Sequence, residues 1–280
     1  MAHEPVIRLA AFLGVFFLIA TWELLSPRRQ LATPKALRWL ANISITVLGT
    51  ALTRGIFPVL AVTVAAKGNT PGLLEHVHLP LSLKVLTGIL ALDLIIYLQH
   101  VTFHAVPLLW RLHMMHHADL DIDVTTGLRF HPIEVMLSMA IKIAAIVIIG
   151  PPVLAVILFE ILLNATSMFN HGNIYIPAGV DKFLRLLVVT PDMHRVHHSV
   201  AIRETNSNFG FNFPLWDRIF RTYKAQPAAG HKDMVIGLSQ FRDRKRLTFP
   251  WLLALPFIGK PGIYPRNPFA RHSEQKKSKK

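Results

Sequence analysis

The chain has 280 residues, of which 52% are hydrophobic and only 16% are charged. This composition excludes a disordered chain, a coiled coil and a collagen-like chain, and it argues against a soluble globular domain. There is no cysteine, so disulfide scaffolds, thiolate metal sites and cysteine nucleophiles are excluded as well. The net charge of +14 is compatible with binding to nucleic acid or to a membrane surface, and the long apolar runs favour the membrane.

Five apolar runs are long enough to cross a bilayer. The first three, in chain order, are 6–25, 40–66 and 85–109. The last two lie within 135–169, which Gly150-Pro151-Pro152 divides into two halves of about one bilayer thickness each. A further apolar stretch, 249–258, is too short to span, and we expect it to be interfacial or packed. The pattern predicts an all-α integral membrane protein with about five spanning helices, or four spans plus a re-entrant hairpin.

Basic residues are concentrated in the first loop and in the tail 271–280. The positive-inside rule then places both in the cytoplasm and the amino terminus outside. We therefore expect a cytoplasmic helical cap formed by 110–132 and 171–223, on the inner face of the membrane.

Ionisable residues inside spans are usually kept by pairing with one another. Lys142 and Glu160 each lie nine residues from Pro151, so a hairpin would bring them to the same depth and predicts an ion pair. Arg54 and Asp93 are a second candidate pair.

The chain has 15 histidines, as many as it has glycines, and ten of the histidines occur in recognisable motifs. His100 and His104 are four residues apart, a spacing that shares one helix face. The pattern HxxHH then occurs twice, at 113–117 and at 194–198, with His131 and His171 between the two copies. The other five histidines, among them His231, lie in loops or tails, where we expect them to be solvated.

Neutral imidazole is a ligand for iron, zinc, copper and nickel, and eight to ten such ligands are too many for one ion. The sequence therefore predicts two metal ions. Hydrolytic two-metal sites usually add carboxylate ligands and a general base, so a site built almost wholly from histidine favours redox-active iron and O2. The alternative of another class is a membrane metal transporter or a metal-binding protein. A transporter should hold its ligands near the bilayer midplane with access from both sides.

The spacing and surroundings of these histidines resemble those of the sterol desaturase/fatty acid hydroxylase superfamily. The chain looks most similar to the bacterial sterol-desaturase-like branch, over roughly 79–223. The resemblance rests on these segments: Asp93 to His104, Leu109 to His117, Arg129 to Glu134, Asn170 to Asn173, Thr190 to Ser199, and Asn206 to Phe220.

The resemblance implies a membrane di-iron oxygenase on a helical scaffold. Such an enzyme uses O2 and two electrons to hydroxylate or desaturate a C–H bond of a membrane lipid, either sterol- or hopanoid-like or fatty-acyl. Ether-lipid or carotenoid monooxygenation is the alternative within the same chemistry. The implied cofactors are two iron ions, for which zinc can substitute in vitro. The chain has no GxGxxG or P-loop pattern, so an external ferredoxin or reductase is the expected electron donor.

By the same resemblance, no catalytic residue is expected beyond the metal ligands. The implied ligands are His100, His104, His113, His116, His117, His194, His197 and His198, completed by His131 and His171. Residues expected to support them are Asp93, Tyr97, Glu134, Asn173, Asp192, Asn206 and Asn208. We divide the chain into N-terminal transmembrane helices (1–78), a histidine-box catalytic region (79–223) and a basic C-terminal cytoplasmic segment (224–280).

Overall fold

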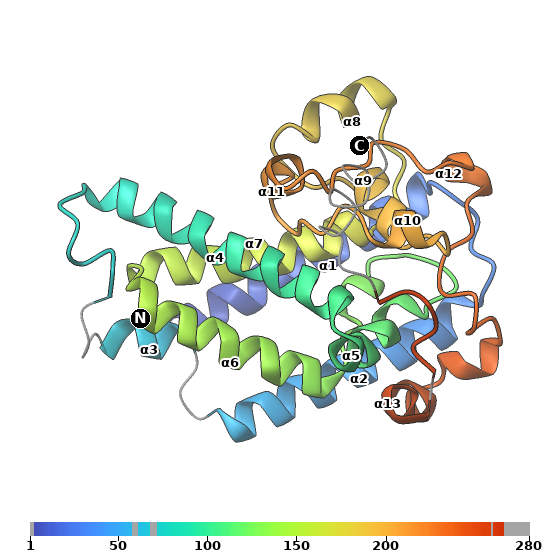
Figure 1. The fold of residues 1–280 in the computed structure, drawn as a ribbon, viewed down its shortest axis with the longest axis horizontal. Coiled ribbons are helices and arrows are strands. Elements are labelled where there is room, and N and C mark those ends of the chain that lie inside the picture. The colour runs from blue at the N-terminus through green and yellow to red at the C-terminus, as the bar shows by residue number, and fades with distance from the viewer. Residues whose placement is uncertain (1–2, 58–60, 68–71, 259, 266–280) are drawn as a thin grey trace, which may run out of the picture.

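The computed structural model describes residues 3–57, 61–67, 72–258 and 260–265. Over these residues the protein is helical and has no strand, with only two isolated β-bridges, between Pro27 and Ile174 and between Ser199 and Ile236. Long helices run side by side through most of the molecule, and short helices gather over one end (Figure 1). The prediction of an all-α architecture is confirmed.

Five helical segments are long and apolar enough to cross a membrane, as the sequence predicted. They are α1 (Glu4–Leu25), α2 with α3 (Lys35–Ile56 and Ala61–Lys67), α4 (Leu81–Ala105), α6 (Pro132–Ile149) and α7 (Val153–His171). Most of their side chains are not buried inside the protein. Apolar helices whose outer faces lack protein partners are typical of a bilayer environment. These features indicate an integral membrane protein.

Proline and glycine set two of the helix ends. The apolar run 85–109 is not one helix, because α4 ends at Ala105 and α5 (Pro107–His117) begins with proline at its first position. The residue before a proline is disfavoured in α conformation, and Val106 is extended. At the opposite end of the bundle, α6 ends at Ile149 and is followed by Gly150, which has a φ of 62°. A side chain there would also collide with the backbone of Gly72.

Two predicted ion pairs inside the spans have different outcomes. Lys142 on α6 pairs with Glu160 on α7, as expected, and Arg8 on α1 joins the same carboxylate at 2.7 Å. The Arg54–Asp93 pair is wrong. Arg54 lies exposed near the end of α2, whereas Asp93 is buried and accepts a hydrogen bond from the Trp216 indole at 2.7 Å. An indole satisfies a buried carboxylate without bringing a second charge into the span.

Short helices and loops form a cap over one end of the bundle (Figure 1). Besides α5, the cap contains η1 (Thr126–Leu128), α8 (Ala178–Leu184), α9 (Pro191–His197), α10 (Ile202–Thr205), α11 (Leu215–Ile219), α12 (Gly230–Asp233), η2 (Arg244–Leu247) and α13 (Phe249–Ile258). The short apolar stretch expected to be interfacial or packed is α13. It packs against α2 and α5, and Leu252 and Leu255 share a buried cluster with Trp110 and Met114.

The loop between α5 and α6 is anchored to the ends of α1 and α2 by buried charges. Arg38 on α2 donates to Asp119 at 2.9 Å and to Asp123 at 2.6 Å. Glu23 near the end of α1 accepts from the backbone N–H groups of Val124 and Asn173. These contacts bring segments from both halves of the chain to the end of the bundle where α4 and α7 finish.

Candidate metal centre

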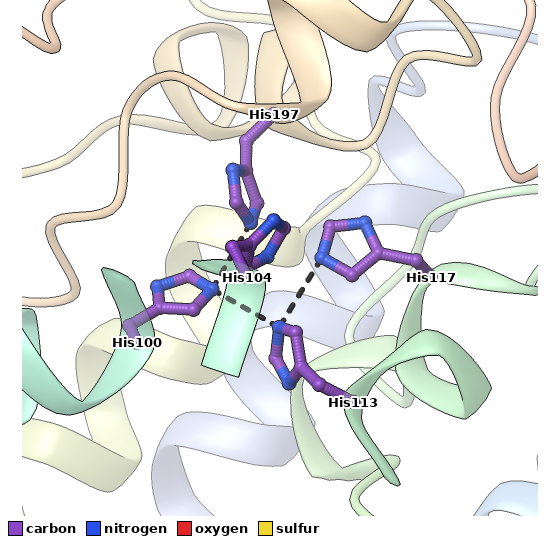
Figure 2. Close-up of side chains that lie close together, drawn as sticks. All are labelled: His100, His104, His113, His117 and His197. Atoms are coloured by element: carbon purple, nitrogen blue, oxygen red, sulfur yellow. Dashed lines mark hydrogen bonds between the residues drawn. The ribbon is translucent and has the colours of Figure 1, made fainter. Parts of the chain in front are cut away.

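Nine of the ten histidines proposed as ligands converge in two groups. Within each group, one nitrogen from every ring lies within 4.8 Å of the others. Group A contains His100, His104, His113, His117 and His197; group B contains His116, His171, His194 and His198. All nine side chains are buried. Figure 2 shows the five rings of group A directed toward one another from α4, α5 and α9.

Each HxxHH segment supplies both groups. On α5, His113 and His117 join group A and His116 joins group B. Around α9 the division is reversed, since His197 joins group A while His194 and His198 join group B. A helix turns by about 100° per residue, so neighbouring histidines point to different sides, and residues four apart share a side. The spacing therefore places the two groups next to each other.

Ring nitrogens within each group lie at the separation expected for ligands of one ion. In group A, the Nε2 atom of His100 is 3.1 Å from Nε2 of His113 and 3.1 Å from Nε2 of His197. In group B, Nε2 of His171 is 3.1 Å from the Nε2 atoms of His116 and His194. Metal–nitrogen bonds of about 2.0–2.1 Å would place neighbouring ligand nitrogens about 2.9–3.4 Å apart, depending on coordination geometry.

Hydrogen bonds at the other ring nitrogen determine which nitrogen is free. In group A, the Nδ1 atoms of His100 and His197 lie 2.7 Å from the carbonyl oxygens of Phe209 and Ser207. In group B, Nδ1 of His116 and of His171 donate to the carbonyls of Arg129 and Ser167. A carbonyl only accepts, so Nδ1 carries the proton, and Nε2 of the neutral ring presents a lone pair.

The facing lone pairs favour a cation between them. Two neutral rings with Nδ1–H tautomers, such as His100 and His197, cannot hydrogen-bond through their Nε2 atoms, which would repel each other at 3.1 Å. Both nitrogens of His104 and of His198 are buried without a hydrogen-bond partner among the described residues. Buried polar atoms are seldom left unpaired in native proteins. The donor set therefore fits metal ions, one to each group.

The electrostatic surroundings keep these rings neutral. Burial, reinforced by neighbouring imidazoles, lowers the pKa of His117, His194 and His198 well below the ordinary histidine value. Neutral imidazole is the form that binds metal. Aromatic side chains close the site from the sides. Phe130 stacks on His116 with ring centroids 4.5 Å apart, and Phe211 lies 5.0 Å from the ring of His100.

His131 lies outside both groups. It is the residue before α6, where its Nδ1 accepts from the backbone N–H of Ile133 at 3.2 Å. Its Nε2 lies 3.3 Å from the carbonyl oxygen of Leu253 on α13. Both ring nitrogens therefore have partners within the protein. Because this position is explained by helix capping, we leave His131 out of the ligand set that we propose.

Glu134 is the predicted supporting residue that touches a ligand directly, since its Oε1 accepts from Nδ1 of His113 at 2.7 Å. The other six lie farther out, where they join the cap to the bundle or hold parts of the cap together. Asp93 binds Trp216, and Tyr97 bonds Thr222 at 2.8 Å. The remaining contacts link Asn173 to Arg29, Asp192 to Arg28 and Arg195, Asn206 to Tyr264, and Asn208 to Met193 and Lys224.

Sequence reasoning missed two kinds of residue at this site. The backbone carbonyls of Ser167, Ser207 and Phe209 orient ligand rings, but a carbonyl leaves no signal in residue type. His231, expected to be solvated, is instead buried, with Nε2 3.7 Å from Oδ2 of Asp192. Its position after Pro227 and Gly230 resembles a surface loop, and only the tertiary fold places it against α9.

The fold and site are those of an integral membrane protein with a buried histidine centre, suited to holding metal, at one end of its helical bundle. Residues 85–222 match the family model described as fatty acid hydroxylase. This match confirms the resemblance to the sterol desaturase/fatty acid hydroxylase superfamily, and it covers the histidine-bearing part of the chain.

Curated relatives agree with this family. The chain is 27% identical to an ornithine lipid hydroxylase of Rhizobium tropici over 80% of its own length and 69% of that protein. It is 27% identical to human alkylglycerol monooxygenase over 55% of its length, but spans only 32% of that enzyme. A very-long-chain aldehyde decarbonylase of Oryza sativa is 26% identical and is covered over 35% of its length. No solved structure matches the chain. The prediction of an oxidoreductase is confirmed.

Proposed function

We propose that this protein is an O2-dependent oxygenase that hydroxylates a C–H bond of a membrane lipid at a centre of two iron ions. The observation that carries the proposal is the convergence of nine buried imidazoles into two adjacent groups with their lone pairs facing inward. Iron bound there would supply the redox chemistry that couples reduction of O2 to oxidation of the C–H bond. Zinc would compete for the same nitrogens in vitro.

The chain's own residues would position and protect this centre. Backbone carbonyls and Glu134 hold the imidazoles in one orientation. The rings of Phe130, Phe209 and Phe211 pack against the histidines and keep bulk water away. A dry, preorganised site limits side reactions of activated oxygen. The three-region division of the chain, with catalysis in 79–223, remains part of this proposal.

The relatives favour a lipid substrate with a long acyl or alkyl chain. The ornithine lipid hydroxylase is the relative that the chain matches over most of both lengths, so an acylated amino-acid lipid of the bacterial membrane is our first candidate. Alkylglycerol monooxygenases match over a smaller share, which makes an ether lipid the second candidate. Hydroxylation is favoured over desaturation because these relatives are named for oxygen insertion.

Basic residues at the histidine end support a cytoplasmic location for the centre. Arg28, Arg29 and Lys35 lie at this end, close to Asp192, Asn173 and Glu23. By the positive-inside rule they would face the cytoplasm, in a bacterial inner membrane. Electrons would then come from a cytoplasmic ferredoxin or reductase. The transporter alternative is disfavoured, because the ligands lie at one end of the bundle.

The decisive experiment is lipid analysis of cells that make ornithine lipids and ether lipids, with and without the intact gene. We expect one lipid to gain one oxygen atom, and growth under isotopically heavy O2 to label that atom. His197→Ala should abolish the product, while Lys232→Ala, at an exposed position of α12, should retain it. Unlabelled product, or full activity of His197→Ala, would contradict the proposal.

A further inference from the structure

The part of the cap that contains α8 and α11 carries a dense apolar surface. Six large side chains there are exposed: Val180, Phe183, Leu186, Leu187, Leu215 and Ile219. Phe183 and Leu187 each expose 64% of their surface and Ile219 exposes 56%. We call residues 178–188 and 215–220 the α8–α11 lobe. None of these residues belongs to a helix long enough to span, yet so large a cluster of exposed apolar side chains is unusual on a surface that faces water.

Hydrogen bonds and ion pairs make the lobe one unit. Arg218 on α11 donates to the carbonyl oxygen of Arg185, just after α8, at 2.9 Å. Arg185 in turn pairs with Asp181 on α8 and donates to the carbonyl of Ala225. Figure 1 shows α8 and α11 in the same part of the cap. These contacts therefore hold the two segments of the lobe against each other.

The contacts of α11 place the lobe beside a span rather than above it. Trp216 donates to Asp93, the thirteenth of the 25 residues of α4. Phe220 stacks on Tyr97, one turn nearer the histidines, with ring centroids 5.4 Å apart. Asp93 precedes His100 by seven residues, so at about 1.5 Å per residue α11 meets α4 about 10 Å toward the bundle centre from that ligand.

Exposed apolar side chains lie on α4 on both sides of its contact with α11. Leu98 directly follows Tyr97 and Leu86 lies two turns before Asp93, and both are exposed and would face lipid acyl chains. The apolar side chains of the lobe continue that surface. Lys182, Arg218 and Arg221 are exposed within or next to the lobe, where long cationic side chains can reach the phosphate layer.

We propose that the α8–α11 lobe is immersed in the bilayer leaflet on the histidine side, as an interfacial membrane contact additional to the five spans. Its partner is the lipid surface, with acyl chains against the six apolar residues and anionic head groups at the basic ones. This differs from a cap that is surrounded by water throughout. It also does not depend on the identity of the metal or of the substrate.

Cysteine labelling can test this cleanly, because the natural chain has no cysteine. We would make Phe183→Cys and Ile219→Cys in the lobe, Leu86→Cys on α4 as the lipid reference, and Lys232→Cys on α12 as the water reference. Each protein is labelled with an environment-sensitive fluorophore and reconstituted into vesicles of phosphatidylcholine and phosphatidylglycerol. Metal content equal to that of the unlabelled protein shows that each variant is folded.

We expect labels at 183 and 219 to behave like the label at 86. Their emission should be blue-shifted, several-fold quenched by spin-labelled lipid and protected from aqueous iodide, with the opposite result at 232. Quenching by iodide at 183 and 219 as strong as at 232 would overturn the proposal. Blue-shifted emission that neither quencher reaches would overturn it too, since that result indicates that the lobe is covered by protein, such as a second copy of the chain.

Discussion

The Oε1 atom of Glu134 lies 2.7 Å from Nδ1 of His113, so a carboxylate on α6 holds a ring on α5 whose Nε2 faces group A. The other oriented rings, such as that of His100, use backbone carbonyls for this purpose. A carboxylate acceptor fixes the tautomer and also makes the imidazole a stronger donor to a metal. Glu134 thus ties the start of a spanning helix to the metal centre.

Replacing Glu134 should weaken metal binding according to what the new side chain can accept. Glu134→Ala removes the acceptor, and we expect a loss of metal affinity or activity of about 10–100-fold. Glu134→Gln keeps an oxygen in place and should lose less. Metal content and product formation in detergent-purified protein would measure both. Glu75→Gln, at an exposed site in the loop before α4, is the matched control. Normal metal content in Glu134→Ala would contradict a role in orienting His113.

The two histidine groups should lose metal separately. His104→Ala in group A and His194→Ala in group B should each lower the content from about two ions per chain to about one, because each group forms its own site. Both variants should lose activity. Elemental analysis after anaerobic loading with iron, on protein that elutes as the native species, measures this.

His131→Ala provides the control, because His131 lies outside both groups. We expect full metal content and a loss of stability of about 1 kcal/mol from the missing helix cap. If His131→Ala lost an ion while His194→Ala kept both, the division into group A and group B would be wrong.

Arg38 should be one of the most sensitive positions for folding. It is fully buried and pairs with Asp119 and Asp123. Burial opposes the charge of Asp119, but Arg38 and Arg129 hold its pKa down at about 2, so the carboxylate stays ionised. Arg38→Leu would leave buried charges unpaired, at a cost of about 3–5 kcal/mol. Thermal unfolding in detergent should show a large decrease in midpoint, whereas the exposed Lys245→Ala should unfold like the parent protein.

His231 should contribute to acid sensitivity. Burial, together with nearby arginines, lowers its pKa to about 4. The folded protein then binds this proton less readily than the unfolded chain does, so stability is full above the ordinary histidine pKa of about 6.5 and declines as the pH falls toward 4. His231→Gln removes this dependence. The change in unfolding midpoint between about pH 7.5 and about pH 5 should therefore be smaller in the variant than in the parent. An identical change in both proteins would show that His231 does not contribute.

Local pattern was enough to predict several features of this protein. The lengths of the apolar runs predicted the five spanning segments, and equal distances from Pro151 predicted the Lys142–Glu160 pair. Arg54 and Asp93 show where such reasoning fails. The positions of Arg54 and Asp93 in the sequence do not indicate how deep the two residues lie in the membrane or which way their side chains point. The partner of Asp93 is instead Trp216, which lies 123 residues away in the chain.

The sequence by itself determined that the chain has segments apolar and long enough to enter a membrane and that its histidines have a spacing that suits a metal site, because hydropathy and the i, i+3, i+4 spacing are properties of local chain geometry. Only the tertiary structure decided how the ligands divide into two groups and that His131 is a cap. It also showed that Glu134 hydrogen-bonds His113 and that Trp216 hydrogen-bonds Asp93. These outcomes depend on how α4, α5, α6 and the cap pack, and such contacts join residues far apart in the chain, which no local spacing encodes.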